Sequence, residues 1–375
     1  MKKIVFLTGT RADFGKLKSL IEVLKNVVDF HVHIFATGMH MDKKYGFTVH
    51  EIEKCGFNNI HKYINHDNGA SMDITLSRTI EGFANYVRLI EPDLIVVHGD
   101  RIEALAGATV GALNNILVAH IEGGEVSGTV DELIRHSVSK LSHIHFVCNE
   151  EAKYRLIQMG EMEENIYEIG SPDIDIMLSN DLPSWEEVKK YYEIDFEDYA
   201  VSMFHPVTTE FNEMDEYAEQ YVQALEQSNE NYIVVYPNND KGSDFILNKL
   251  KRLENNSSFR VFPSVRFESF LVMLQKAKYI IGNSSAGIRE APVYGIPTVN
   301  VGTRQNGRTS DATIIHTGYT RKEILKGISK AKSITITKRQ LFGDGGSKKK
   351  FLHIICDGQF WNISKQKKFA ERVLY

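Results

Sequence analysis

Short apolar runs alternate with longer amphipathic stretches along the whole 375-residue chain. Several of the short runs are β-branched and nearly continuous, which is typical of parallel strands covered by helices on both faces. The pattern therefore predicts an α/β fold built from βαβ units. The predicted strands are Lys3–Leu7, Phe30–Ala36, Leu94–Val97, Ile116–His120, Ile144–Cys148 and Ile166–Ile169 in the first half, and Tyr199–Phe204, Tyr232–Tyr236, Phe259–Phe262, Tyr279–Ile281, Thr298–Val301 and Thr313–His316 in the second half.

Six strands followed by six strands indicate two Rossmann-like domains, because a chain of this length is too long for one ordinary core. A polar, helical-looking stretch from Trp185 to Asp198 separates the halves, so we place the boundary near residue 180. We expect an N-terminal domain over 1–178 and a C-terminal domain over 179–357. A final amphipathic segment predicts a helix over 358–375 that returns to the first domain.

Composition narrows the function classes. The net charge of −5 argues against general nucleic-acid binding, because no overall positive field attracts phosphates. The three cysteines form no CxxC pair, and the histidine pairs lack a third ligand at metal spacing, so we predict no metal and no disulfide framework. No apolar stretch approaches the ~20 residues of a membrane helix, and the short apolar N-terminus is interpreted as a strand rather than a signal peptide. We expect a cytoplasmic protein.

The residues directly after each strand are the candidates for function, since doubly wound sheets bind ligands beyond the carboxyl ends of their strands. After the first strand, the segment Gly9–Lys16 fits neither the GxGxxG fingerprint nor a Walker A loop, so no nicotinamide cofactor is expected. A glycine turn that opens a helix exposes N–H groups to an anion, and Arg11 and Lys16 add charge. A tight turn with exposed charges is the equally plain alternative.

Two carboxylates, Asp100 and Glu122, directly follow apolar strands and stand among glycines that leave room for a ligand. Two such groups in one site supply an acid and a base when their environments separate their pKa values. Further along, Asp131 and Arg135 share one face of a predicted helix, where a surface ion pair is the alternative interpretation.

In the second half, His205 and Asn238 also stand at strand ends, although a histidine before proline is often only a hydrogen-bonded turn residue. The segment Gly282–Gly287 contains Ser284 and Ser285 and leads into a predicted helix with Glu290. A helix N-terminus with two hydroxyls offers an anion site. A simple Asn/Ser helix cap is the alternative.

Taken together, these segments resemble the UDP-N-acetylglucosamine 2-epimerases, in particular the hydrolysing branch that supplies N-acetylmannosamine for sialic-acid synthesis. The shared motifs are GTRAD at 9–13, HGDR at 98–101, HIEGGEVSGTVD at 120–131, HP at 205–206, GNSSAGIRE at 282–290 and GTRQNGR at 302–308. The non-hydrolysing branch has GDTT-like and HVEAGLR-like segments where this chain has Arg101 and the GGEVSG loop. The resemblance implies a glycosyltransferase-B-like fold, with the site in the cleft between the two domains and the nucleotide on the C-terminal one.

The resemblance also implies residue roles. Asp100, Glu122 and Asp131 would form the acid/base group around the sugar, with His205 among the catalytic residues. The diphosphate would be held by Arg11, Ser284 and Ser285, the ribose by Glu290, and the nucleotide side lined by Asn238. The sugar would be oriented, or leaving charge stabilised, by Arg101, Arg135, His136 and His205, and substrate binding would also involve Lys16, Arg266 and Arg304.

For the reaction we expect cleavage of C1–O, anti-elimination to a 2-acetamidoglucal, and hydration to UDP and free N-acetylmannosamine. No cofactor is implied. The alternatives are the same reaction on a UDP-linked 2,4-diacetamido-trideoxy sugar of a legionaminic-acid pathway, and a non-hydrolysing 2-epimerase. A retaining glycosyltransferase or a catalytically silent nucleotide-sugar sensor would share the fold. The expected partners are the UDP-sugar, UDP and further copies of the chain in a dimer or tetramer, with no membrane or nucleic acid.

Overall fold

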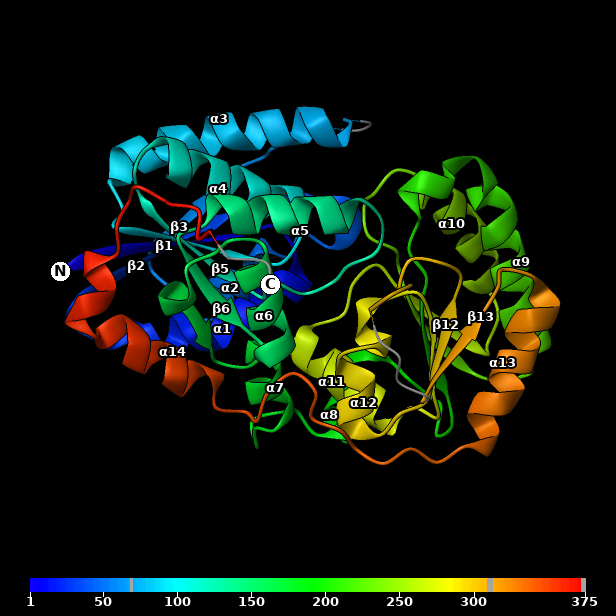
Figure 1. The fold of residues 1–375 in the computed structure, drawn as a ribbon. Helices are drawn as coiled ribbons and strands as arrows, with labels where there is room; N and C mark the ends of the chain where they lie inside the picture. The colour runs from blue at the N-terminus through cyan, green and yellow to red at the C-terminus, as the bar shows by residue number, and fades with distance from the viewer. Residues whose placement is uncertain (68–69, 309–312, 372–375) are drawn as a thin grey trace. The chain divides into compact units, whose positions relative to one another are not determined.

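The protein is described by a computed structural model that covers residues 1–67, 70–308 and 313–371. The chain divides into two compact units. Unit 1 contains Met1–Glu125, Asp131–Ser179 and Phe342–Tyr375, and unit 2 contains Val126–Val130 and Asn180–Leu341. Each unit is an α/β layer structure with its own core (Figure 1).

Unit 1 has a seven-stranded parallel sheet in the order β3-β2-β1-β4-β5-β6-β7. The strands are β1 Lys2–Thr8, β2 Phe30–Ala36, β3 Ile60–Lys62, β4 Leu94–His98, β5 Leu117–Ile121, β6 Ile144–Val147 and β7 Ile166–Glu168. The strand order reverses between β1 and β4, and such a switch point is where doubly wound folds place their ligands.

Helices cover both faces of this sheet, with α3 packed on α4 and with α14 and α7 packed on α1 (Figure 1). The helices of unit 1 are α1 Arg11–Lys25, α2 Val49–Lys54, α3 Met72–Ile90, α4 Ile102–Leu113, α5 Thr129–Leu141, α6 Glu150–Gln158, α7 Pro172–Met177 and α14 Ser347–Cys356, with short 3-10 turns η1 Gly38–Met41, η2 Lys43–Tyr45, η3 Glu163–Asn165 and η7 Gly358–Asn362. The start of α1 is fixed by Thr10, whose side chain accepts a hydrogen bond from the backbone N–H of Asp13.

Unit 2 has a six-stranded parallel sheet in the order β10-β9-β8-β11-β12-β13. Its strands are β8 Ala200–Met203, β9 Tyr232–Val235, β10 Phe259–Phe262, β11 Ile280–Gly282, β12 Thr298–Val301 and β13 Ile314–Thr317. Its helices are α8 Trp185–Tyr192, α9 Met214–Gln227, α10 Ser243–Leu250, α11 Phe267–Lys276, α12 Glu290–Tyr294 and α13 Arg321–Ser333, with 3-10 turns η4 Thr208–Glu213, η5 Lys251–Leu253 and η6 Ser285–Gly287.

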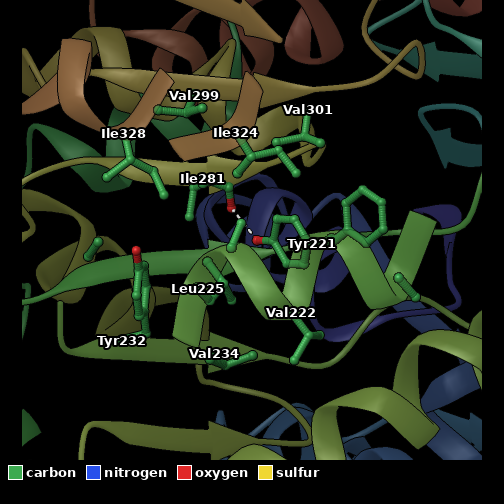
Figure 2. Packing of buried hydrophobic residues seen from close by; sticks show 14 of the residues in the cluster. Tyr221, Val222, Leu225, Tyr232, Val234, Ile281, Val299, Val301, Ile324 and Ile328 are labelled. Atoms are coloured by element: carbon green, nitrogen blue, oxygen red, sulfur yellow. Dashed lines mark hydrogen bonds between the residues drawn. The ribbon is translucent and has the colours of Figure 1, made fainter. Parts of the chain in front are cut away.

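The core of unit 2 joins its sheet to α9 and α13 (Figure 2). Tyr221 on α9 is fully buried in this core, and its hydroxyl donates to the backbone oxygen of Ile281 at 3.1 Å. Val299 and Ile328 pack in the same cluster. A buried tyrosine is tolerated here because its one polar atom has a hydrogen-bond partner.

The predicted fold class is confirmed: two parallel-sheet α/β domains, each covered by helices. Each of the twelve predicted strands overlaps an observed one, with ends that differ by at most two residues. The prediction missed β3, whose three residues contain a single apolar side chain, Ile60. This edge strand is placed by its pairing with β2 rather than by its own pattern.

The C-terminal helix predicted over 358–375 is wrong. The last helix is α14, only the 3-10 turn η7 follows, and 363–371 contains no helix, while 372–375 lies outside the described residues. The tail is held extended because its polar groups bond elsewhere in unit 1: Lys367 Nζ donates to the backbone oxygen of Ser139 at 2.9 Å, and Ala370 N donates to that of Gly160 at 2.9 Å.

Candidate active site

In unit 1, Glu122 lies directly after β5 and is 3% exposed. Its backbone has φ +63°, in the left-handed region, and its N–H donates to the backbone oxygen of Phe146 at 2.9 Å. Ser171 donates its hydroxyl to Oε1. Oε2 lies 3.1 Å from His98 Nε2 and 3.6 Å from Lys16 Nζ. The carboxylate therefore accepts from, or pairs with, donors on both oxygens, which is how a buried negative charge is tolerated.

His98 ends β4 and lies between two carboxylates. Its Nδ1 is 3.0 Å from Asp13 Oδ1, and its Nε2 is the atom that faces Glu122. Burial alone would lower the pKa of His98, but the charges of Glu122 and Asp13 and their hydrogen bonds raise it to about 9. The ring is therefore an imidazolium at neutral pH.

Lys16, on α1, joins a second carboxylate to this group. Its Nζ lies 3.1 Å from Asp173 Oδ2, and Asp173 belongs to the first turn of α7. Both side chains are buried. Lys16 was expected to bind substrate, but in this structure it pairs with Glu122 and Asp173, so its visible role is to balance their charge.

Arg135 connects Asp100 to the same group. Its guanidinium donates to Asp100 Oδ2 and, at 2.6 Å, to the backbone oxygen of Glu122. Asp100 remains 23% exposed, and Gly99 before it has φ +71° with no atom within 4 Å of the position a Cβ would take. The Asp100 carboxylate is thus partly accessible, and the turn before it has open space beside Gly99.

His120 on β5 supports the turn at Gly99, next to Asp100. Its Nε2 donates to the backbone oxygen of Gly99 at 2.8 Å, and Nδ1 is 3.1 Å from Ser139 Oγ. Burial lowers the pKa of His120 well below its usual value, so the ring is neutral. It fixes the Gly99 turn rather than adding charge.

Four other candidates of unit 1 have partners elsewhere. Arg11 Nη2 lies 3.8 Å from Glu51, and Arg101 Nε lies 3.6 Å from Glu103. His136 pairs with Glu132 on the same helix at 2.9 Å, and Asp131 stands partly exposed in the first turn of α5. The structure thus joins Lys16, Asp100, Glu122 and Arg135 in one network.

In unit 2, a fully buried asparagine, Asn283, fixes the loop after β8. Its Oδ1 accepts from the backbone N–H of His205 at 2.6 Å, and its Nδ2 donates to the backbone oxygen of His205 at 2.8 Å. The ring of His205 in turn accepts at Nδ1 from the backbone N–H of Asn238, at 3.0 Å. An acceptor at Nδ1 requires the neutral tautomer with its proton on Nε2. Asn238 also donates its side-chain amide to Asp240.

The segment Gly282–Glu290 differs from the helix start that the sequence predicted. Ser284 caps a single 3-10 turn, η6, with its hydroxyl accepting from Ala286 N at 3.3 Å, and Ser285 is the first residue of that turn. Glu290 begins the short helix α12 and is 4% exposed, rather than lying one to two turns down a helix. The break between η6 and α12 has a local cause. Gly287 packs against Thr298, and Thr298 donates its hydroxyl to the Gly287 carbonyl at 2.7 Å, which interrupts a continuous helix.

The remaining two candidates of unit 2 lie in different surroundings. Arg304 donates to the backbone oxygen of Asn283 at 3.3 Å, so it joins the loop that carries the serines. Arg266 caps α11, with its guanidinium over the ring of Tyr191 at 4.6 Å.

Sequence reasoning did not select His98, Asp13, Asp173 or Ser171 in unit 1, or Asn283 in unit 2. His98 and Asp13 belong to the HGDR and GTRAD motifs, so position after a strand could have found them. Ser171 and Asp173 follow β7, the last predicted strand of the first domain, where no candidate residue was selected.

Within 1–67, 70–308 and 313–371, no group of three His, Cys, Asp or Glu side chains is arranged to hold a metal ion. In the same part of the chain, no helix combines the length and the apolar character needed to cross a bilayer.

Comparison with known proteins identifies the family of this chain. The model of the UDP-N-acetylglucosamine 2-epimerase family matches residues 22–356. The chain is 50% identical over 375 residues to a UDP-N-acetylglucosamine 2-epimerase of Neisseria meningitidis serogroup B, with 99% of each chain covered. It is 34% identical over 352 residues to a UDP-N,N'-diacetylbacillosamine 2-epimerase (hydrolyzing) of Legionella pneumophila, with 92% of this chain and 93% of the relative covered.

Among solved structures, the UDP-GlcNAc 2-epimerase of Methanocaldococcus jannaschii in complex with UDP-GlcNAc and UDP aligns with a TM-score of 0.78 at 21% identity, covering 95% of this chain and 99% of that chain. At that identity the likeness bears on the fold. The family model and the two relatives extend over nearly the whole chain, and on that ground the protein belongs to the UDP-N-acetylglucosamine 2-epimerase family.

Proposed function

We propose that this enzyme is a hydrolysing UDP-N-acetylglucosamine 2-epimerase that releases UDP and free N-acetylmannosamine. The observation that carries the proposal is the network of unit 1, in which Glu122 and Asp100 are both held by cationic donors at the carboxyl ends of adjacent strands. Family membership supports the 2-epimerase activity. The hydrolysing step is supported by the relative from Legionella pneumophila, whose name includes it, and by the GGEVSG loop.

The chemistry requires the leaving group to depart before C2 reacts, because the C2 hydrogen of the sugar is not adjacent to a carbonyl. The C1–O bond breaks and its electron pair leaves with UDP. A carboxylate then takes the C2 proton, and the C–H electrons form the C1–C2 double bond of a glycal. Water adds its oxygen to C1 while C2 receives a proton on the opposite face. The sum is UDP and the free 2-epimer.

Asp100, Glu122 and Asp131 are the proposed acid/base group. Removal of the C2 proton and its return to the other face require two groups with different protonation states. Arg135 donates to Asp100, which is 23% exposed, and an accessible carboxylate paired with a cation suits a proton acceptor. His205, with its proton on Nε2, is a neutral donor suited to the sugar or to the leaving oxygen.

On the nucleotide side, we assign the diphosphate to Ser284, Ser285 and Arg11, the ribose to Glu290, and the rest of the nucleotide to the neighbourhood of Asn238. The hydroxyls of Ser284 and Ser285 can donate to a developing phosphate anion. Arg304 lies against Asn283, one residue before Ser284, which supports placing it with this group.

The alternative substrate is a UDP-linked 2,4-diacetamido-trideoxy sugar, the chemistry named for the relative from Legionella pneumophila. The 50% identity to a relative named for UDP-N-acetylglucosamine favours the simpler sugar. Parallel assays with both nucleotide sugars distinguish the two, and the proposal expects the larger kcat/KM for UDP-N-acetylglucosamine.

One labelling experiment tests the reaction itself. The enzyme is incubated with UDP-N-acetylglucosamine in deuterated, oxygen-18 water, and the products are followed by NMR and mass spectrometry. Free N-acetylmannosamine with deuterium at C2 and oxygen-18 at C1 is expected. A mixture of UDP-sugars without free sugar would instead identify a non-hydrolysing 2-epimerase.

A further inference from the structure

We propose that Asp13 and His98 are a positioning pair that holds Glu122 as an ionised carboxylate in one orientation for proton transfer at C2 of the sugar. This inference rests on the proposed function, because it assigns a task within that reaction. It concerns residues that touch Glu122 from α1 and β4 rather than the substrate itself.

The first argument is the ion-pair geometry. A histidine between two carboxylates satisfies both only when both ring nitrogens carry protons. His98 faces Asp13 Oδ1 at 3.0 Å and Glu122 Oε2 at 3.1 Å, and its side chain is 10% exposed. A buried imidazolium between two anions is thus a stable arrangement, whereas a neutral ring would leave one oxygen facing a lone pair.

The second argument is that Asp13 is itself fixed. Its Oδ2 accepts from the backbone N–H of Gly9 at 2.9 Å, and its own N–H is capped by Thr10. The glycine turn after β1 therefore holds Asp13, Asp13 orients His98, and His98 orients Glu122. The GTRAD segment, which the sequence predicts to be an anion-binding turn, thus also has the task of holding Asp13 in place.

The third argument concerns the other groups around this pair. From α1, Lys16 faces Glu122; from α7, Asp173 faces Lys16; from α5, Arg135 contacts the Glu122 backbone. From β5, neutral His120 approaches from the Gly99 side. The pKa of His98 is about 9, so among the rings facing this site it is His98 that carries charge at neutral pH and loses it in the alkaline range.

The inference predicts a distinct pH behaviour. In the wild type, kcat should fall as the pH rises through about 9, because neutral His98 no longer supports ionised Glu122 on both sides. Without the imidazolium, Glu122 should bind a proton more readily, which moves the acidic limb of the profile to higher pH. UDP affinity should change little, because no phosphate contact is altered.

The experiment compares His98→Gln, Asp13→Asn and the double variant in the full-length enzyme. We expect kcat to fall about 100-fold in His98→Gln, within the range typical of acid–base groups, and somewhat less in Asp13→Asn. The double variant should be no worse than His98→Gln, since residues that act in series are not additive. The inhibition constant of UDP should stay within about threefold of the wild type in each, well below one tenfold step of affinity.

The matched control is His145→Gln. His145 lies on β6 of the same sheet, is 1% exposed and pairs with Glu161 at 3.0 Å. It should keep the wild-type alkaline limb near pH 9 and most of the activity. An equal loss of kcat in the control, an unchanged pH profile in His98→Gln, or additive losses in the double variant would each overturn the inference.

Exchange of the C2 proton with deuterium is measured in the same reactions. Exchange needs the same carboxylate whether the sugar is released or returned to UDP. If the wild type produced UDP-N-acetylmannosamine instead of free sugar, hydrolysis would be refuted, while exchange in the variants would still decide the role of His98.

Discussion

The strand ends of the two units are built from different chemistry. In unit 1, the side chains after β1, β4 and β5 are held by charge, with His98 and Lys16 against Glu122 and Arg135 against Asp100. In unit 2, the loops after β8 and β11 are held by a neutral amide, Asn283, that bonds to both backbone groups of His205.

The two kinds of strand end differ in how they respond to pH. A charged network keeps its carboxylates ionised in a buried place, and its charge changes with pH. An amide side chain does not titrate between the pH ranges of acids and amines, so it fixes the backbone geometry throughout that interval. The edge of unit 1 is therefore suited to proton transfer, and that of unit 2 to presenting fixed donors to a phosphate.

The largest effect should come from Glu122→Gln. The amide keeps the size of the side chain but places an N–H₂ donor against His98 or Ser171, which also donate. We expect kcat to fall by about 10³-fold, a loss in the range of acid–base groups, with UDP affinity nearly unchanged. Steady-state kinetics and UDP competition measure both, and unchanged turnover would remove Glu122 from the acid/base group.

The next effect concerns stability and pH. The folded-state pKa of His98 is raised to about 9, so its contribution is fully present below the ordinary value of about 6.5 and is lost as the pH rises through 9. The wild type should thus lose on the order of 3 kcal/mol relative to His98→Gln between pH 6.5 and 10. Urea unfolding across this interval tests it, and parallel curves for the two proteins would contradict the assignment.

In unit 2, we expect Asn283→Ala to destabilise the loop after β8. It removes both clamping bonds and leaves the backbone N–H and carbonyl of His205 without their protein partner. We expect a loss of about 2–3 kcal/mol, a higher KM, and no shift of the pH profile. Calorimetry and kinetics check this, and a displaced pH limb would show that the two edges are less separate than their bonding suggests.

The smallest effect is expected for Ser285→Ala, which removes one hydroxyl from the η6 turn without disturbing the Ser284 cap. UDP affinity should weaken about 10-fold, since one hydrogen bond to a charged group contributes about 1.5 kcal/mol or more, while kcat changes less. Calorimetric titration with UDP measures the change. Normal affinity would place the diphosphate elsewhere.

The sheets could be predicted from sequence because their strands are long apolar runs with local signals, as Phe30–Ala36 and Thr298–Val301 show by matching at both ends. The tail could not. Phe369 and its neighbouring lysines resemble a helix face, but Lys367 instead donates to the carbonyls that end α5. A hydrogen bond to a segment more than 200 residues away leaves no local pattern.

The site shows the same limit. Asp100 and Glu122 could be found because they directly follow strands. Their partners come from α5, from α1 and from Ser171 before α7, so the network itself could not be predicted from sequence spacing. A helix containing Glu290 was predicted, but the break between η6 and α12 was not, since Gly287 and Thr298 meet only in the folded chain.

The placement of α14 has a consequence for synthesis. Phe351, Ile355 and Phe360 complete the core that contains Ile4 and Phe6 of β1. A nascent chain that ends at Leu341 already holds every residue of unit 2 but exposes an unfilled apolar face on unit 1. Because domains fold as units while the ribosome proceeds, unit 2 can become native first, and the core around β1 is completed only after α14 has been made.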